Sequence, residues 1–597
     1  MPADVFSLLY LLSALPGILC LFGVLYNYVC RLRDGSDMAV PLLDQNFLNF
    51  MPGIDRRELE ELLTDEERWT CIVCAFGNLA TDATCNLCGA PPTTNLDDVT
   101  LTSRQRTARR RRQWTRRIND DGNVQWVQQG DPSQLNTAWR IFSTVDHSSL
   151  VVVEEHIDGM TTRPINQWPD MSKTELQLHC VAVEDDNVDG STTMLGVQLT
   201  QTSWESLVAV SHLTFSSKYA WFLQHIAAMR VPFSQTHLQI KADRSRLFED
   251  AVTELLDLKG PLRCAVARHQ FEGEAAIDAG AVQREWYTLV SHAFLAPERQ
   301  LFQVTNRSDN SYFVASHCSD VDDSRGDLFR VVGRFIGRAL LDGQVIPMHL
   351  NPIVFNAILG LPIVFEDLED FDPTVCKSLA YVLECDNVDE LALTFSASTV
   401  DGDGAMVQVD LIENGRQIAV ENHNRVDFVQ AMVRHLIFGR VERHLAGLIQ
   451  GLYDIVPPEL LLVFDHKELE LILCGLPVVD VVDWKLNTVT TANLRNHQVT
   501  DWFWQVVEAM ESRDQGKLLQ ISTGASRVPV QGFKGLTSYD GRICYFTLKG
   551  VKYKVGAYPV VHACFNRIDL PLYPTKELLE DALRMLLLSD PTGFNTV

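Results

Sequence analysis

Two pairs of cysteines in the first hundred residues place the tightest constraint on how this chain can fold. Both pairs have the spacing Cys-x-x-Cys, and ten residues separate Cys71 and Cys74 from Cys85 and Cys88. A segment of about 20 residues buries too little apolar surface to fold unaided, whereas four thiolates can hold one tetrahedral metal ion. The sequence therefore predicts a zinc finger over residues 67–92, with one structural zinc ion as its cofactor.

The other cysteines and the overall composition indicate several folded units in a reducing compartment. With 597 residues the chain is too long for a single core. The chain has 14 cysteines, and most of those outside the two pairs stand singly along the sequence. This is not the pattern of a disulfide framework. The formal net charge of −26 repels phosphate backbones and anionic lipid. Binding of nucleic acid is therefore not expected, except through a local basic patch.

A run of 26 uncharged residues, Val5 to Cys30, lies near the N-terminus. As a helix it is long enough to cross a bilayer core of roughly 30 Å. Arg31 and Arg33 follow it, and basic residues tend to flank the cytosolic end of a membrane span. Residues 5–30 are therefore predicted to be the transmembrane helix of a single-pass membrane protein, followed by a linker at 31–66 in the cytosol. A signal peptide and a buried core helix are the alternatives.

Residues 93–211 are expected to contain a basic linker and a β-rich part. Eight arginines fall within residues 104–117, and such a run is usually a solvated tether. Contact with an anionic membrane surface and binding of RNA are the alternatives, and the nearby membrane span favours the first. Residues 118–211 mix short Val-rich runs with Gly, Asn and Asp turns, which indicates a small β-rich module of unassigned role.

Helical periodicity dominates from about residue 212 onward. In the segment 329–339, for example, apolar residues recur every three to four positions. Gly333 and Gly337 in this segment would favour dimerisation of a helix in lipid, but Arg330, Arg334 and Arg338 lie between the apolar positions. A soluble amphipathic helix is therefore predicted. The sequence has no phosphate-binding loop or dinucleotide fingerprint, so ATP or NAD chemistry is not indicated.

The cysteine-rich segment, with Trp69 and Asn78, resembles the small zinc fingers named after a Ran-binding nucleoporin. That family includes readers of ubiquitin and readers of single-stranded RNA. The positions that bind ubiquitin in the first group correspond here to Ala75, Phe76 and Leu87, which predicts an exposed apolar patch at Phe76 and Leu87. Ala75 departs from the usual Thr. The finger has no basic residue, which disfavours RNA, and a purely structural or partner-docking role is the alternative to ubiquitin binding.

A second resemblance covers the last 380 residues or so. The segment YPVVHACFNRIDLPLY, from Tyr558 to Tyr573, resembles the active-site segment of HECT-type ubiquitin ligases, in which Cys564 would be the catalytic cysteine. Ala563 stands where Thr usually precedes this cysteine. Other landmarks follow in the family's order, namely IDAGAVQREWY from Ile277, GRFIGRALLDG from Gly333, FDHKELELILCG from Phe464, DWKLNT from Asp483, WFW from Trp502 and SRVPVQGF from Ser526.

The resemblance implies an α+β fold with two lobes. The larger, mainly helical N-lobe would span residues 212–487 and bind a ubiquitin-conjugating enzyme. The smaller α/β C-lobe would span residues 488–597 and carry Cys564. Residues 488–493 are polar and lack apolar periodicity, so a hinge between the lobes is predicted there.

The activity implied is that of an E3 ubiquitin-protein ligase. Cys564 would accept ubiquitin from the conjugating enzyme as a thioester and pass it to a lysine of a protein substrate, in a catalytic domain on the cytosolic side of the membrane. A thiolate suits this step because exchange between thioesters is nearly isoenergetic. His562 is a candidate for holding the thiolate or ordering its loop. Phe594 matches an apolar residue that docks the C-terminal tail between the lobes in the resembling family.

Two other functions use the same residues. Ala563 and Ala75, as departures from the two family patterns, suggest a catalytically inactive, membrane-anchored scaffold that binds ubiquitin. A hydrolase of the Cys-His type could also be built on Cys564 and His562. An adduct with ubiquitin that thiols reverse would distinguish the ligase from both.

Overall fold

The computed structural model describes residues 68–588, except 81, 97–99, 130–134, 136, 144–175, 184–186, 197–198, 232, 234, 275–280, 307–310, 317–323, 401–405, 477, 526, 531 and 537–543. The predicted transmembrane helix at 5–30, the linker at 31–66 and Phe594 lie outside this part of the chain. Among the described residues, no helix combines the length and apolar character that a membrane span requires.

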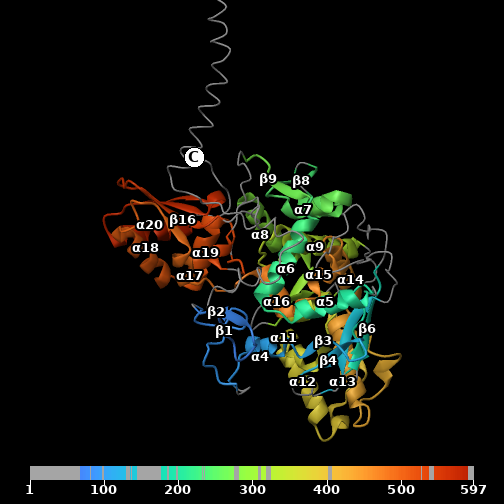
Figure 1. Ribbon diagram of the computed structural model, residues 1–597. Helices are drawn as coiled ribbons and strands as arrows, with labels where there is room; N and C mark the ends of the chain where they lie inside the picture. The colour runs from blue at the N-terminus through green and yellow to red at the C-terminus, as the bar shows by residue number, and fades with distance from the viewer. Residues whose placement is uncertain are drawn as a thin grey trace, which may run out of the picture.

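Two lobes and a small cysteine-rich unit make up the described molecule, which confirms the predicted α+β class (Figure 1). Separate hydrophobic cores form the larger N-lobe and the smaller C-lobe. The N-lobe is mainly helical because apolar stripes at helical spacing face one another across it. Its helices are α5 (Gln201–Ser211), α6 (Phe215–Met229), α7 (Leu247–Leu256), α8 (Ala281–Leu295), α9 (Ser324–Asp342), α10 (Pro352–Leu359), α14 (Glu442–Tyr453), α15 (Pro458–Leu461) and α16 (His466–Cys474).

Helices α9 and α14 form the centre of the N-lobe, and glycines let their backbones touch. A methyl group at Gly333 would overlap the carbonyl of Leu448, and one at Gly451 would overlap the carbonyl of Arg330. The arginines of α9 do not lie on a solvated face, as an amphipathic helix would have them. Arg334 is only 2 % exposed, and its Nε lies 2.8 Å from the Asp454 carboxylate. Ion pairing inside the lobe, rather than water, stabilises these charges.

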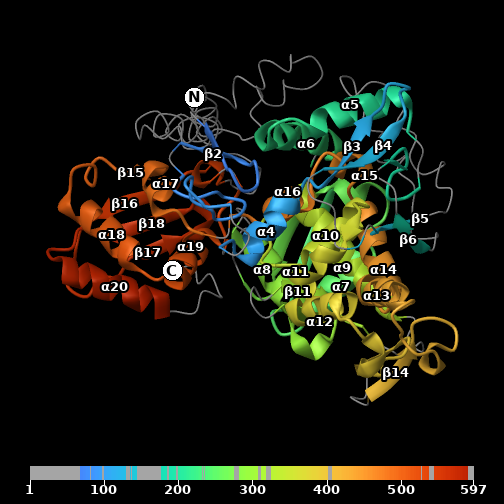
Figure 2. The ribbon, with the colours of Figure 1, turned by 90° about the horizontal axis from the view of Figure 1, so that it is seen from below.

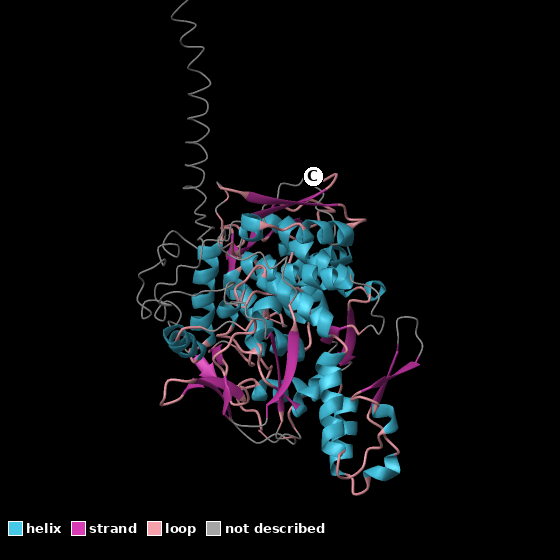
Figure 3. Ribbon diagram, turned by 90° about the vertical axis from the view of Figure 1, so that its right-hand side faces the viewer, coloured by secondary structure: helices cyan, strands magenta, loops and turns pink. Residues whose placement is uncertain are grey.

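The N-lobe also contains two small two-stranded sheets. They are β8 (His237–Ala242) with β9 (Val266–Phe271), a parallel pair, and β10 (Phe302–Asn306) with β11 (Ser311–Val314), an antiparallel pair. A mostly helical piece projects from the lobe, as Figures 2 and 3 show. It comprises α12 (Pro373–Glu384), β13 (Ser396–Val400), β14 (Met406–Asp410) and α13 (Arg425–Arg434). The short helix α11 (Leu368–Phe371) precedes this piece and is packed in the lobe core.

The region 93–211 is not a linker followed by an independent module. Its strands and helix α5 are packed into the N-lobe core, where Trp139 and Trp204 are each 2 % exposed. Trp139 of β5 also pairs with Ile363 of strand β12 (Ile363–Val364). The predicted N-lobe boundary at 212 is therefore too late. The elements of this region are α4 (Ser103–Arg110), β3 (Trp114–Ile118), β4 (Val124–Gln128), β5 (Ala138–Ser143), β6 (Leu178–Val183) and β7 (Asn187–Asp189).

A four-stranded sheet in the order β15-β16-β18-β17 forms the C-lobe. The first two neighbouring pairs are parallel, and β17 is antiparallel to β18. The fully buried Trp484 lies in the core, stacked on Phe533 with ring centroids 4.8 Å apart. The elements are α17 (Val481–Leu486), β15 (Thr488–Thr490), α18 (Gln498–Ala509), α19 (Ser512–Thr523), β16 (Phe546–Val551), β17 (Val560–His562), β18 (Arg567–Pro571) and α20 (Lys576–Leu588).

The predicted hinge at residues 488–493 is wrong. Thr488–Thr490 is strand β15, paired in parallel with β16, and the Asn493 side chain donates to the Gly550 carbonyl at 2.7 Å. Helix α17 already belongs to the C-lobe core through Trp484. The chain therefore passes between the lobes at 475–480, after α16 and before α17. Polar, small residues occur at 488–493 because β15 is a partly exposed strand, not because the segment is a free connection.

Candidate active site and metal centre

The predicted catalytic segment forms a tight turn at the sheet of the C-lobe. Strand β17 ends at His562, the short helical turn η11 (Ala563–Phe565) contains Cys564, and β18 returns antiparallel from Arg567. The turn closes at Asn566, whose φ of 47° is left-handed. Asn is one of the few residues other than Gly that adopt this conformation readily. The segment is therefore a tight turn between two strands of a sheet.

The side chains beside Cys564 hold this turn from two sides. Ala563 is 2 % exposed and Asn566 is fully buried, whereas Phe565 is 54 % exposed. The Asn566 amide donates to the Cys544 carbonyl at 2.6 Å, and its own carbonyl accepts from the Thr547 amide at 2.8 Å. These bonds anchor the turn to β16 and the residues before it. Phe565 is then left on the outer side, as an exposed apolar side chain next to the predicted nucleophile.

His562 lies on the adjoining strand and faces a carboxylate. Its Nε2 is 3.4 Å from Asp569 Oδ2, and Arg567 Nε and Lys549 Nζ lie 2.9 Å and 3.8 Å from the same carboxyl group. Asp569 of β18 thus gathers three basic side chains on one face of the sheet. This contact gives His562 a defined orientation on β17. A direct role of His562 at the thiol stays a prediction.

Helix α8 of the N-lobe reaches this turn through Arg284. The Arg284 Nη2 donates to the Ala563 carbonyl and to Asn566 Oδ1, at 3.2 Å in each case. The three residues of the Arg-Glu-Trp segment point in different directions: Glu285 pairs with Arg244 at 2.8 Å, and Trp286 lies in the core. One motif thereby packs the N-lobe and contacts the C-lobe.

Arg284 and Asn566 lie within the family motifs of the sequence but were not predicted to be site residues. A signal for each is present in the sequence. Asn566 is a polar residue with left-handed preference directly after the Cys-Phe pair, and Arg284 and Glu285 interrupt an otherwise uncharged helical stretch. Their mutual contact was not predictable because 282 positions separate them.

The four predicted metal ligands converge in the small unit. One candidate ligand atom from each of Cys71, Cys74, Cys85 and Cys88 lies within 4.8 Å of all the others, and all four residues are buried. The sulfurs of Cys71 and Cys88 are 3.6 Å apart, and those of Cys74 and Cys85 are 3.5 Å apart. A tetrahedral site with metal–sulfur bonds of roughly 2.3 Å would separate its sulfurs by about 3.8 Å. The cluster can therefore hold a metal ion.

Short strands and one asparagine set the two knuckles against each other. Strand β1 (Arg68–Thr70) pairs with β2 (Gly77–Leu79) in antiparallel register. The Asn78 side chain donates to the Phe76 carbonyl at 3.1 Å and accepts from the Asn86 amide at 2.9 Å, so it connects both knuckles. Ala75, which follows the first knuckle, is exposed and has a φ of 55°.

The predicted exposed patch on the finger is wrong. Phe76 is 5 % exposed and Leu87 is 4 % exposed. Phe76 packs against Phe215 of α6 with ring centroids 5.4 Å apart, and the same cluster contains Leu471 of α16. The lobe covers this face because two apolar side chains on so small a unit gain more from burial there than from contact with water. Ubiquitin cannot contact Phe76 or Leu87 while the finger is docked.

The finger also touches the connection between the lobes. Leu476, which follows α16, and Val530 of the C-lobe pack partly buried against the finger's apolar cluster. Figures 1 and 2 accordingly show β1 and β2 beside the place where the two lobes meet. The finger is thus in contact with both lobes.

The basic segment 104–117 is not a solvated tether, and it does not present its charge to a membrane or to RNA in this structure. Arg111 donates through Nε to the Cys74 carbonyl at 2.8 Å and through Nη1 to Glu468 at 3.0 Å and to Asp465. Lys218 Nζ lies 2.7 Å from the other oxygen of Glu468. Burial works against the charge of Arg111, but the two carboxylates outweigh it and raise its pKa above the ordinary value.

The neighbouring arginines of this segment also pair with the N-lobe. Arg106 contacts the carboxylate of Glu369, and Arg110 lies 3.3 Å from Asp370 and 3.5 Å from Asp367. On the other side, Arg104 donates to the Leu87 carbonyl at 2.8 Å. Helix α4 therefore connects the finger to the lobe by charge-assisted hydrogen bonds.

The predicted catalytic segment thus lies on a turn of the smaller lobe, and this turn contacts the larger, mainly helical lobe. The family model described as HECT-domain (ubiquitin-transferase) matches residues 288–597, more than half of the chain. The chain therefore belongs to the HECT family. This confirms the family inferred from the catalytic segment.

Curated relatives agree with this assignment. The chain is 34 % identical over 387 residues to "E3 ubiquitin-protein ligase TOM1-like" of Neurospora crassa, covering 64 % of this chain and 9 % of that protein. It is 32 % identical to "E3 ubiquitin-protein ligase TOM1" of Saccharomyces cerevisiae, covering 60 % and 11 %. It is 32 % identical to "E3 ubiquitin-protein ligase HACE1" of Xenopus laevis, covering 64 % and 41 %. The first of these matches spans about a tenth of the relative's length.

Proposed function

We propose that this chain is an E3 ubiquitin-protein ligase that works with a ubiquitin-conjugating enzyme and carries ubiquitin as a thioester on Cys564. The observation that supports this most directly is the position of Cys564 in η11, on a turn anchored to the C-lobe sheet and contacted by the N-lobe. Membership of the HECT family supports the same activity.

The reaction proceeds in two balanced steps. The Cys564 thiolate attacks the carbonyl carbon of the conjugating enzyme's thioester, and the cysteine of that enzyme leaves as a thiolate. A lysine amine of the substrate then attacks the new thioester, the bond to Cys564 sulfur breaks, and an amide forms with loss of a proton. Neither step consumes a nucleotide or needs a metal ion, because one thioester already carries the free energy for the amide.

An assay with purified ubiquitin-loaded conjugating enzyme tests this proposal. A ubiquitin adduct that thiols reverse is expected on the wild-type chain and on Cys385→Ala, whose cysteine lies in the N-lobe region outside the catalytic segment. Cys564→Ala is expected to form none, and Cys564→Ser to trap an oxyester that resists thiols. An adduct of undiminished amount on Cys564→Ala contradicts the proposal. Net release of ubiquitin without an adduct would favour the hydrolase, and absence of both would favour the inactive scaffold.

We propose that the metal held by the cysteine cluster is zinc and that its role is structural. The thiolate ligands and the near-tetrahedral spacing of the sulfurs support zinc. The burial of Phe76 and Leu87 supports a finger that docks on its own N-lobe, in place of the predicted ubiquitin-binding surface. One zinc per chain by metal analysis is the expected result, and its absence from chain purified without chelator contradicts the assignment.

We propose that residues 5–30 anchor the chain in a membrane with the catalytic domain in the cytosol. The uncharged run and the arginines after it support this orientation. Extraction with alkaline carbonate should leave the full chain in the membrane pellet, and protease added to sealed vesicles should digest the catalytic domain. Release into the supernatant would contradict the anchor, and protection of the domain would reverse the orientation.

Phe594 is proposed to act in the second step, by docking the C-terminal tail between the lobes. The support is its match to the family position and the break in helical pattern after residue 588. Deletion of residues 594–597 should leave loading of Cys564 intact and slow discharge to lysine. An unchanged discharge rate contradicts this role.

A further inference from the structure

We propose that Arg284 is a positioning residue for the transfer of ubiquitin to lysine. Arg284 seats the turn that carries Cys564 on helix α8 of the N-lobe, and this seating is required for transfer but not for loading. The inference rests on the proposed ligase activity. The family model's match begins at residue 288, so Arg284 lies just outside it.

The hydrogen bonds of Arg284 reach residues on both sides of Cys564, the predicted nucleophile. Arg284 Nη2 lies 3.2 Å from the carbonyl oxygen of Ala563, the residue before Cys564, and 3.2 Å from Oδ1 of Asn566, two residues after it. The Arg284 residue is 8 % exposed, and both acceptor residues are buried. A guanidinium that donates to both ends of so short a turn fixes the orientation of the residue between them.

Asn566 is prepared for this contact by bonds within the C-lobe. Because its amide nitrogen donates to the Cys544 carbonyl, its side-chain oxygen is left facing α8. Its backbone carbonyl accepts from Thr547, and its left-handed φ of 47° directs the chain from η11 into β18. The acceptor is therefore held in place whether or not Arg284 is present. This allows a well-ordered C-lobe to meet the N-lobe through a preformed site.

A glycine of the C-lobe approaches the same turn of α8. Gly524 ends α19 with a φ of 82°, and a Cβ built on it would lie 3.2 Å from the carbonyl of Ala281 and 3.4 Å from the Cβ of Arg284. Backbone of the C-lobe thus lies directly beside Arg284. Close packing and a charge-assisted hydrogen bond coincide at one place on the seam between the lobes.

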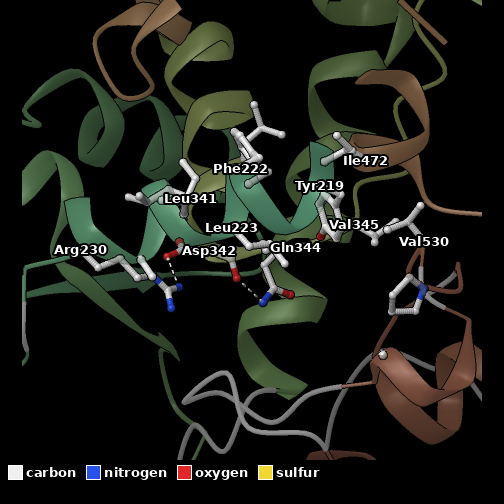
Figure 4. Close-up of a pocket in the computed structure, with 17 residues that line it drawn as sticks. Tyr219, Phe222, Leu223, Arg230, Leu341, Asp342, Gln344, Val345, Ile472 and Val530 are labelled. Carbon is white, nitrogen blue, oxygen red and sulfur yellow. Dashed lines mark hydrogen bonds and ion pairs between the residues drawn. The ribbon is translucent and has the colours of Figure 1, made fainter. Parts of the chain in front are cut away.

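The seam is looser on its other side. A pocket of about 100 Å³ is lined by α6, the end of α9, Ile472 and the C-lobe residues Pro529, Val530 and Gly535. Figure 4 shows Val530 at one side of this pocket and Arg230, bonded to Asp342, at the other. A seam that is tight at Arg284 and open at this pocket is suited to a C-lobe that docks and releases.

The two half-reactions make different demands on this contact. For loading, Cys564 must reach a conjugating enzyme bound elsewhere on the N-lobe, and movement of the C-lobe helps it to do so. For transfer, the thioester must be held still while a lysine attacks it. Loss of a fixed geometry slows such a step strongly even when both reactants are bound. Arg284 therefore acts on the second step, through the turn, without touching ubiquitin or lysine itself.

Single-turnover kinetics on the full chain separate these steps. The chain is loaded from ubiquitin-charged conjugating enzyme, further charging is stopped, and discharge to a lysine-bearing acceptor protein is followed. Arg284→Ala should load at a rate within about twofold of wild type and discharge roughly tenfold more slowly, as expected for one charged hydrogen-bond donor. Arg284→Lys should recover part of the discharge rate. Arg268→Ala, an exposed arginine on β9, is the matched control and should change neither step.

A second variant tests whether Arg284 acts through the turn. Asn566→Gly keeps the left-handed backbone but removes both the acceptor and the bond to Cys544, so adding Arg284→Ala to it should slow discharge little beyond Asn566→Gly alone. Fully additive losses would overturn the proposal. So would an unchanged or faster discharge in Arg284→Ala, or a loading rate that falls as far as discharge.

Hydrogen exchange of residues 560–568 measures the seating without any ubiquitin. Arg284→Ala should raise exchange there while exchange in β16, within the same lobe, stays unchanged. Equal exchange in wild type and variant overturns the seating. A wild-type chain that accepts no ubiquitin overturns the proposed ligase function and the transfer role with it, but this measurement still decides whether Arg284 seats the turn.

Discussion

The zinc finger and the C-lobe both dock on the N-lobe, and they do so through contacts of different kinds. At the finger junction, Arg111 is buried between the Cys74 carbonyl and two carboxylates of α16, and Phe76 lies on Phe215. At the C-lobe junction, Arg284 donates to neutral acceptors, and a glycine backbone packs against α8.

This difference predicts which junction opens. Separating the finger would leave buried carboxylates with fewer partners and expose an aromatic pair, which costs several kcal/mol. Separating the C-lobe would return neutral carbonyl and amide groups to water, which costs little because water replaces the lost hydrogen bonds. The finger is therefore a fixed part of the N-lobe, and the C-lobe is its movable partner.

Removing the metal should have the largest effect on the finger junction. Metal binding supplies free energy on the order of 10 kcal/mol to a unit of this size, so a strong chelator should unfold the finger and undock it. New protease cleavage within residues 68–93 and a lower thermal midpoint of the N-lobe are expected, with Cys385→Ser as a control that keeps both at wild-type values. A chelated chain with unchanged cleavage would show that the finger is held by the lobe alone.

Arg111→Ala should be the most damaging single substitution at this junction. It leaves Asp465 and Glu468 buried with Lys218 and the more distant Arg112 as cations, and breaking a buried pair in this way costs about 3–5 kcal/mol. Unfolding in urea measures the loss. Arg443→Ala, at an exposed position on α14 of the same lobe, is the control and should cost under about 0.5 kcal/mol. A similar free energy of unfolding for both variants would contradict a buried ionic junction.

The N-lobe itself should show a pH dependence that belongs to neither junction. Burial raises the pKa of Glu459 on α15 to about 7, and neither carboxylate oxygen has a hydrogen-bond partner among the described residues. The folded state therefore binds the proton more tightly than the unfolded state. The stabilisation that this proton gives the folded state is fully present below about pH 4.5, and it is lost as the pH rises through about 7.

Glu459→Gln should remove this dependence. The variant should gain roughly 2–3 kcal/mol relative to wild type between pH 5 and pH 8, since each unit of pKa shift corresponds to about 1.4 kcal/mol. Urea midpoints of the N-lobe at the two pH values give the result. If the difference in the free energy of unfolding between the two proteins is the same at both pH values, Glu459 is already charged in the folded lobe at pH 5, and the prediction is wrong.

Gly524→Ala should have the smallest effect, on the stability of the C-lobe and on its junction with the N-lobe. Alanine at this left-handed position costs about 1 kcal/mol, and its Cβ would also press on the Ala281 carbonyl. Gly556→Ala is the matched control, because its φ of 79° is similar and nothing lies within 4 Å of a Cβ there. Both variants should lower C-lobe stability alike, but only Gly524→Ala should raise hydrogen exchange at the start of α8. Equal exchange in the two variants would mean that the lobes do not touch at Gly524 in solution.

Local sequence was sufficient where the chemistry itself is local. The four cysteines were predictable as one cluster because the Cys-x-x-Cys spacing is set by the geometry of a single ion. The segment around Cys564 was recognisable because it resembles the active-site segment of the family over a few consecutive residues. The two-lobed α+β class followed from landmarks that the family keeps in order.

The other predictions failed because the contacts that decide them join residues far apart in the sequence. Arginines at 104–117 look solvated because their carboxylate partners at 366–370 and 465–468 lie more than 250 residues away. Phe76 looks like a surface for a partner protein because nothing near it in sequence reveals that Phe215 covers it. The strand at Thr488–Thr490 looks like a hinge because its own residues are polar, and only pairing with β16 defines it.

The glycine contacts between α9 and α14 determine how the N-lobe can deform. Packed helices commonly accommodate change by sliding past one another over a layer of side chains, in a shear motion. Here Gly333, Gly337 and Gly451 bring one helix against the backbone of the other, and backbone atoms offer no rotamers to adjust. Shear is therefore closed to this pair. The α9–α14 pair should therefore move as one rigid body, so a rotation of the C-lobe about the connection between α16 and α17 would leave this part of the N-lobe unchanged.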